Sequence, residues 1–146
     1  MKIFVGQIYI EPGVAYPFSH HFQIWISEEL TKRIRPSTKF INAYSDDYNL
    51  IFNLSAKSKI LEPEIKGPTV FKDDKDVEFT IFLPYEIFEL PEKDEYEQPL
   101  ILLFSCIVQV LQSLGMDVSR LERDAASLIK QARSDPSMIA VRKPLS

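Results

Sequence analysis

The sequence of 146 residues predicts an α+β fold, with an antiparallel sheet of about five to six strands and two C-terminal helices packed on one face. Two observations lead to this prediction. Two-residue hydrophobic alternation, typical of half-buried strands, dominates the first part of the chain, and long helical stretches come last. Hydrophobic residues at 45% and charged residues at 26% are ordinary globular values. We therefore expect a single domain over residues 1–146.

The first two strands are expected near the N-terminus. Residues 2–10 are apolar and β-branched and end at Glu11-Pro12-Gly13, which predicts a strand followed by a loop. Alternation over Phe22–Ile26 predicts a second strand. Ser27 can then cap a short helix that ends at Pro36.

Two hairpins are expected next. Residues 38–56 alternate on both sides of Ser45-Asp46-Asp47, whose short polar side chains favour a turn. The alternation in its second arm, from Tyr48 onward, is the clearest in the chain. Residues 69–83 predict a second hairpin that turns at Asp73–Asp76. One face of its second arm is apolar, formed by Val77, Phe79, Ile81 and Leu83.

Two helices complete the prediction. Pro99 fits a first helical position and Gly115 a C-terminal cap, and Leu100–Leu114 between them is apolar on nearly every side. This helix should be the central buried one. Asp117 is expected to cap an amphipathic last helix, which Asp135-Pro136 ends.

Acidic residues are concentrated in one stretch. Residues 73–97 hold ten of the 21 acids and only two lysines, Lys75 and Lys93. Aromatic residues such as Phe79 and Tyr85 are interleaved with the acids, so the stretch is not typical of a disordered acidic tail. A folded acidic surface suits a basic protein partner and repels nucleic acid. The alternative is a solvated face whose charge prevents aggregation, and both interpretations stay open.

No pattern of catalytic or metal-binding residues accompanies these acids. His20 and His21 are adjacent, and in a strand they would point to opposite faces, so they cannot readily chelate one ion. Cys106 falls in the middle of the apolar helix, where a packing role is expected. The four glycines form no phosphate-binding cluster. We expect no enzyme, no metal and no cofactor.

The N-terminus has no signal-peptide pattern, and the longest apolar run, Leu100–Leu111, is too short to span a bilayer. A single cysteine fits a reducing compartment. These features predict a cytoplasmic protein with no membrane partner.

Three stretches together resemble bacterial immunity proteins of polymorphic and contact-dependent growth inhibition toxin systems. They are Ile24–Glu29, the charged turn and strand Asp73–Ile81 followed by Tyr85 and Phe88, and the long apolar helix from Leu100 with its amphipathic successor. The resemblance covers roughly residues 22–132. It implies a non-enzymatic inhibitor that binds a cognate toxin domain tightly, and such domains are often nucleases with basic active sites.

The sequence therefore predicts an immunity protein whose acids meet a basic toxin domain. The residues expected to bind are Asp73, Asp74, Asp76, Glu92, Asp94, Glu95 and Glu97. Two alternatives stay open: a small cytosolic enzyme that uses carboxylates and a histidine, and an adaptor subunit of a larger assembly. The oligomeric state is not predicted.

Overall fold

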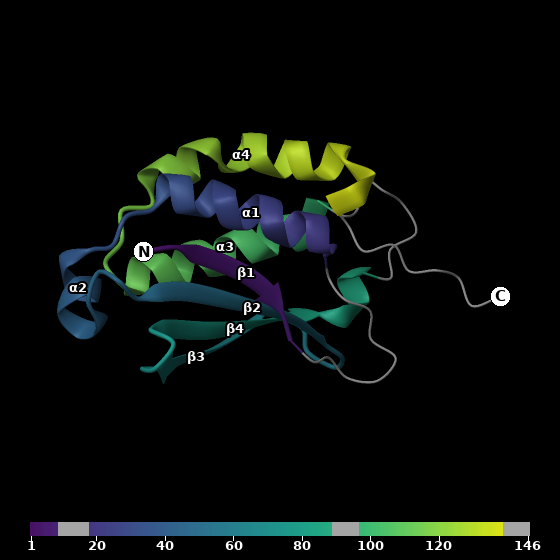
Figure 1. Cartoon of the computed structure of the whole chain (residues 1–146). Helices are drawn as coiled ribbons and strands as arrows, with labels where there is room; N and C mark the ends of the chain where they lie inside the picture. The colour runs from purple at the N-terminus through teal and green to yellow at the C-terminus, as the bar shows by residue number, and fades with distance from the viewer. Residues whose placement is uncertain (9–17, 89–96, 139–146) are drawn as a thin grey trace.

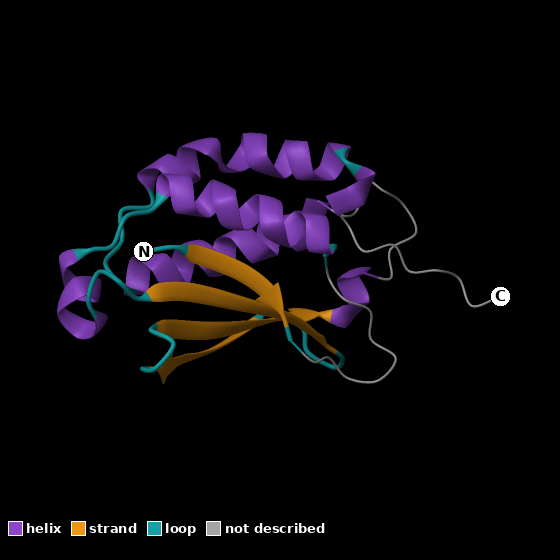
Figure 2. Cartoon of the chain, viewed as in Figure 1, coloured by secondary structure: helices purple, strands orange, loops and turns teal. Residues whose placement is uncertain are grey.

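A computed structural model describes residues 1–8, 18–88 and 97–138 and shows an α+β protein (Figure 1). Its sheet is flanked by helices on one side, as Figure 2 shows by colour. The strands are β1 (Ile3–Gln7), β2 (Asn49–Lys57), β3 (Glu64–Phe71) and β4 (Asp76–Pro84). The helices are α1 (His20–Arg33), α2 (Thr38–Tyr44), α3 (Glu97–Ser113) and α4 (Ser119–Ser134), with short 3-10 helices η1 (Tyr85–Phe88) and η3 (Pro136–Met138).

The sheet is mixed, so the prediction of an antiparallel sheet is wrong. The strand order is β1-β2-β4-β3, and β1, β2 and β4 are all parallel. Only the edge strand β3 runs antiparallel, beside β4. The described residues form four strands rather than five or six. The reason for the parallel pairing is the connection from β1 to β2, which passes through α1 and α2 as a crossover, whereas a short hairpin loop would give antiparallel strands.

The strand predicted over Phe22–Ile26 is part of helix α1 instead. Phe22, Ile26 and Leu30 are all fully buried at four-residue spacing, which is helical periodicity. Ser19 caps the helix by accepting a hydrogen bond from the backbone N–H of Phe22 at 3.1 Å. Ser27, predicted as the cap, lies in the middle of the helix.

The predicted first hairpin is also wrong in its first arm, because residues 38–44 form α2. Ser37 caps this helix by accepting from the backbone N–H of Phe40 at 3.0 Å. Phe40 is fully buried, and its ring lies 5.2 Å from that of Tyr44, one helical turn later. The second arm is confirmed as a strand, β2, but it pairs with β1 and β4.

The second hairpin and both C-terminal helices are confirmed. β3 and β4 pair antiparallel around a turn at residues 72–75, and Val77, Phe79, Ile81 and Leu83 are buried as predicted. Gly115 ends α3 in the left-handed conformation with a φ of 73°. The N-cap of α4 is Val118 rather than the predicted Asp117, although the Asp117 carboxylate accepts a hydrogen bond from the backbone N–H of Ser119 at 3.0 Å.

One hydrophobic cluster fills the space between the sheet and the helices. Its sheet side comes from alternate residues of the strands, including Leu50, Phe52 and Leu54 of β2. Its helix side comes from α1, α3 and α4. The other face of the sheet has none of these helices over it (Figure 2). Among the described residues, no helix is both long enough and apolar enough to cross a membrane.

Candidate protein-binding surface

Two turns that are far apart in sequence meet at one end of the sheet. The turn between α2 and β2 is joined to the β3–β4 turn by a backbone hydrogen bond from Asn49 N–H to the Lys75 carbonyl, at 2.8 Å. The Lys75 ammonium also forms an ion pair with the Asp47 carboxylate. We call the resulting group of carboxylates the acidic end. It consists of Asp46, Asp47, Asp73, Asp74 and Asp76.

The acidic end has an excess of negative charge. Its five carboxylates are accompanied by Lys72, Lys75 and the N-terminal ammonium of Met1, which donates to the Asp46 carbonyl at 3.3 Å. Lys2 lies beside them, since its backbone N–H donates to the Asn49 side chain at 3.4 Å, so four positive and five negative charges leave a net −1. The hydrogen bond from Lys75 lowers the pKa of Asp47, and the Ser45 hydroxyl adds to this effect. Asp47 therefore stays ionised at physiological pH.

Both turns contain a non-glycine residue in the left-handed region. Ser45 has a φ of 95°, and Lys75 has a φ of 54°. Such conformations cost of the order of 1 kcal/mol each and persist only where the surroundings hold them. Here the Asp47 carboxylate does so, because it accepts hydrogen bonds from both the Ser45 hydroxyl and the Lys75 ammonium. The two turns thus hold each other in place.

The acidic end continues onto the side of the sheet opposite α1, α3 and α4, which we call the open face. Phe71 pairs with Asp76 across β3 and β4, and its side chain is 44% exposed. The amides of Asn49 and Asn53 donate to the carboxylates of Asp76 at 3.4 Å and of Glu78 at 2.7 Å, so β2 orients the acids of β4. An exposed aromatic ring therefore lies beside the Asp76 carboxylate, but Phe71 lies outside the predicted stretch 73–97, and Phe79 within that stretch is buried in the core.

The structure separates the predicted binding residues. Asp73, Asp74 and Asp76 lie together at the start of β4, whereas Glu97 begins α3, which contacts η1 after the end of β4. Eight steps of about 3.3 Å separate the two ends of β4, or about 26 Å. Figure 1 shows the β3–β4 turn and the start of α3 at opposite ends of the molecule. Glu92, Asp94 and Glu95 lie outside the described residues.

Glu97 has its own partner. Its carboxylate accepts a hydrogen bond from the Arg133 guanidinium at 3.1 Å, which links the start of α3 to the end of α4. In contrast, Asp46 and Asp47 join the acidic end although the sequence indicated only a turn there. The residues around Asp46 and Asp47 do not predict this position, because it depends on the parallel pairing of β2 with β4.

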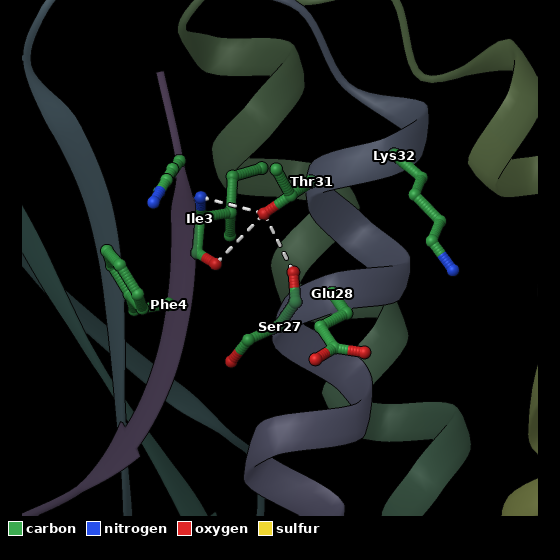
Figure 3. A pocket seen from close by; sticks show the side chains of 7 residues that line it. Ile3, Phe4, Ser27, Glu28, Thr31 and Lys32 are labelled. Atoms are coloured by element: carbon green, nitrogen blue, oxygen red, sulfur yellow. Dashed lines mark hydrogen bonds between the residues drawn. The ribbon is translucent and has the colours of Figure 1, made fainter.

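A separate hollow of about 380 Å³ lies between β1 and α1 (Figure 3). The hydroxyl of Thr31 accepts from the Ile3 N–H at 3.0 Å and donates its one proton to the Ser27 carbonyl at 2.8 Å, while the Ser27 hydroxyl accepts from the Val5 N–H at 2.8 Å. These hydroxyls accept the hydrogen bonds of the outward-facing backbone N–H groups of β1. They are structural groups with their hydrogen bonds already made, which does not favour a nucleophilic role.

The other candidate chemical groups are also placed. His20 and His21 begin α1, and the His21 imidazole lies 3.9 Å from the Asp135 carboxylate on an exposed surface. Cys106 is buried, as predicted, and burial raises the pKa of its thiol to about 11. In the described ranges, no group of three or more histidine, cysteine, aspartate or glutamate residues could hold a metal ion.

Comparison of the chain with protein-family models, curated proteins and solved structures finds no match.

Proposed function

We propose that this chain is an immunity protein that binds and neutralises a cognate bacterial toxin domain through its acidic end. The observation that carries the proposal is the convergence of two turns, in which residues as far apart as Asp47 and Lys75 are paired. This pairing adds Asp46 and Asp47 to the acids expected from the sequence. It also gathers all five carboxylates at one end of the sheet, where Phe71, with an exposed ring, pairs with Asp76.

The chemistry of this surface favours a basic protein. Carboxylates gathered at one end of a molecule attract a positively charged partner over a distance and accelerate its association. A nuclease binds phosphates with lysine and arginine side chains, and an acidic inhibitor can occupy the same groups. Phe71 supplies an aromatic contact of the kind that is enriched at interface hot spots.

The test is binding to a cognate toxin domain, which is sought first among the genes next to this one, and binding is measured over a range of salt concentrations. The double substitution D73K/D74K should slow association at least tenfold at low salt and reduce the salt dependence, because both acids are exposed and attract the partner before contact. The matched control is E28K/E122K, which changes the net charge equally on exposed positions of α1 and α4. An unchanged affinity and salt dependence in D73K/D74K would contradict the proposal.

A second binding measurement, on a variant at Glu97, locates the interface. Glu97 is paired with Arg133 at the opposite end of the sheet, so E97K should bind the toxin domain as the wild type does if the acidic end alone forms the contact. Loss of binding in E97K with normal binding in D73K/D74K would move the interface to the start of α3. The role of Glu92, Asp94 and Glu95 stays a prediction.

A further inference from the structure

The side of α3 that points away from the core has no charged residue. From Gln98 to Met116 the chain contains no lysine, arginine, histidine, aspartate or glutamate, whereas six of the 16 residues of α4 are charged. Exposed helix surfaces are normally charged or polar, yet Ile101 on this side is 42% exposed. The centres of protein interfaces are depleted in charged residues. The outer side of α3 is therefore a candidate interface.

Two rows of residues, one on each helix, form this surface. The row on α3 has intervals of four, three and four residues, the heptad spacing of packed helix pairs, and consists of Ile101, Ser105, Val108 and Gln112. The row on α4 repeats these intervals and consists of Glu122, Ala126, Ile129 and Arg133. A hollow of about 400 Å³ lies between the helices and is lined from both of them. We call the two rows together the outer helix face.

Charge on the outer helix face is confined to its two ends. At one end the Gln112 amide donates to the Glu122 carboxylate at 3.4 Å. At the other end the Arg133 guanidinium donates to the Glu97 carboxylate at 3.1 Å. These two contacts show that α3 and α4 run antiparallel, side by side. The middle of the face, at the level of Ser105, is uncharged.

We propose that the outer helix face pairs two copies of this chain. A two-fold axis that crosses α3 at Ser105, and α4 midway between Ala126 and Ile129, makes each helix antiparallel to the same helix of the second copy. Ser105 then meets Ser105 of the second copy, and Glu122 meets Arg133 of the second copy. The Arg133 guanidinium has five N–H donors, so it can bond to this second carboxylate while it keeps Glu97. The contact is isologous, so the Glu122–Arg133 pair forms twice.

The size of the face agrees with a weak dimer. The 17 residues of α3 and the 16 of α4, at about 1.5 Å per residue, give helices about 25 Å long, and each is about 10–12 Å wide with its side chains. Two faces of two helices each therefore bury about 1,000–1,200 Å² in total, at the lower limit for a specific interface. Association should accordingly depend on protein concentration.

A cysteine at the two-fold axis tests this arrangement. In S105C/C106A the new thiols of two copies face each other. At about 1 mM and without reductant, this variant should form a disulfide-linked dimer at least ten times faster than Q131C/C106A does, as measured by non-reducing electrophoresis. Gln131 is the matched position because it is exposed on α4 outside the outer helix face.

Charge reversal tests the ends of the face. E122R and R133E should each weaken dimerisation at least tenfold in sedimentation equilibrium, because each places like charges opposite each other twice. An equimolar mixture of the two variants should dimerise again, since both contacts in the mixed dimer join opposite charges. E28R and R120E make the same charge changes at exposed positions outside the face and are the controls.

Three results would overturn the proposal. They are a wild type that stays monomeric at about 1 mM, equal rates of disulfide formation in the two cysteine variants, and a mixture of E122R and R133E that stays monomeric while both keep the wild-type circular dichroism spectrum. No toxin is present in these experiments. Toxin binding is measured at concentrations at which a weak dimer is dissociated, so neither result decides the other and the E28K/E122K control keeps its meaning.

Discussion

The two faces of the same sheet differ in almost every physical respect. On the covered face, Leu50, Phe52 and Leu54 of β2 are fully buried against the helices. On the open face, the residues that alternate with them include Asn53, whose amide orients a glutamate. One strand therefore serves stability on one side and carries polar, oriented groups on the other. The difference teaches that the helices bury every second residue of β2, whereas on the other face of this strand Ser55 alone is buried.

The two edges of the sheet repeat this contrast. The outer N–H groups of Ile3 and Val5 in β1 donate to hydroxyls of α1. At the other edge, β3 is mostly exposed and is interrupted between Lys66 and Thr69, where Gly67 has a φ of 128°. A Cβ at Gly67 would lie 2.8 Å from the Glu78 carbonyl oxygen, so this position requires glycine. Such an irregularity hinders edge-to-edge pairing with other chains.

The largest expected effect on stability comes from replacing a phenylalanine on the covered face, and the same replacement on the open face gives the comparison. Phe52→Ala removes a fully buried ring that stacks on Phe79 and should lower the free energy of unfolding by about 3–5 kcal/mol. Phe4→Ala removes a ring on the open face and should cost about 1 kcal/mol or less, because that ring is already 44% exposed. Urea unfolding followed by circular dichroism measures both. Equal losses would show that the open face contributes to the core.

The sequence predicted the elements whose hydrophobic pattern reflects the covered face, and it failed where long-range contacts decide the structure. β2 and β4 were found because their alternation reflects one covered face, and α3 and α4 because they carry long helical patterns. The first half of α1 was missed because Phe22 and Ile26 satisfy both a two-residue and a four-residue spacing, and only the packed core distinguishes them, whereas the second half was predicted as a short helix after Ser27. The acidic end was half predicted. Its β3–β4 turn is local in sequence, whereas Asp46 and Asp47 join it through long-range strand pairing.

The second prediction concerns the covered edge of β1. Thr31→Val keeps the shape of the side chain but leaves the Ile3 N–H without its acceptor at 3.0 Å. The free energy of unfolding should fall by about 1–3 kcal/mol, the usual cost of an unsatisfied buried donor. Thr69→Val, on an exposed position of the open face, should change it by less than about 0.5 kcal/mol. If both variants match the wild type in urea unfolding, water replaces the hydroxyl at β1 without loss.

A smaller effect is expected where α1 joins α4. The Arg33 guanidinium donates to Asp124 at 2.9 Å and to Glu29 at 2.6 Å. Hydrogen bonds from Arg123, and then from Arg33, lower the pKa of Asp124 below its ordinary value. A carboxylate with a lowered pKa stabilises the folded state above its unfolded pKa, and that stabilisation is lost as the pH falls through its folded pKa.

Arg33→Met should therefore lower the urea midpoint at pH 7 by less than Thr31→Val does. The difference from the wild type should be constant down to about pH 5 and shrink below about pH 4, where carboxylates protonate. Arg120→Met is the control, because Arg120 is exposed on α4 and the ion pairs of Asp124 are formed with Arg33 and Arg123 instead. A midpoint difference that persists unchanged at pH 2 would assign the effect of Arg33 to packing alone.

The smallest effect on stability is expected at Cys106, whose thiol also reports the difference between the two sides of the sheet. Because burial raises the pKa of this thiol to about 11, its thiolate fraction at pH 8 is lower by roughly two orders of magnitude than that of an ordinary thiol with a pKa of about 8.5. Alkylation by iodoacetamide should be slower by at least that factor than in the variant T69C/C106A, whose thiol lies on the open face. The rate at Cys106 should rise with pH up to about 11, and both proteins should react at similar rates in concentrated urea.

Cys106→Ala should keep toxin binding, since the thiol only fills space among Leu103, Ile107 and Val110. Rapid labelling of folded Cys106 at pH 7 would instead identify an accessible, activated thiol and revive the enzyme alternative.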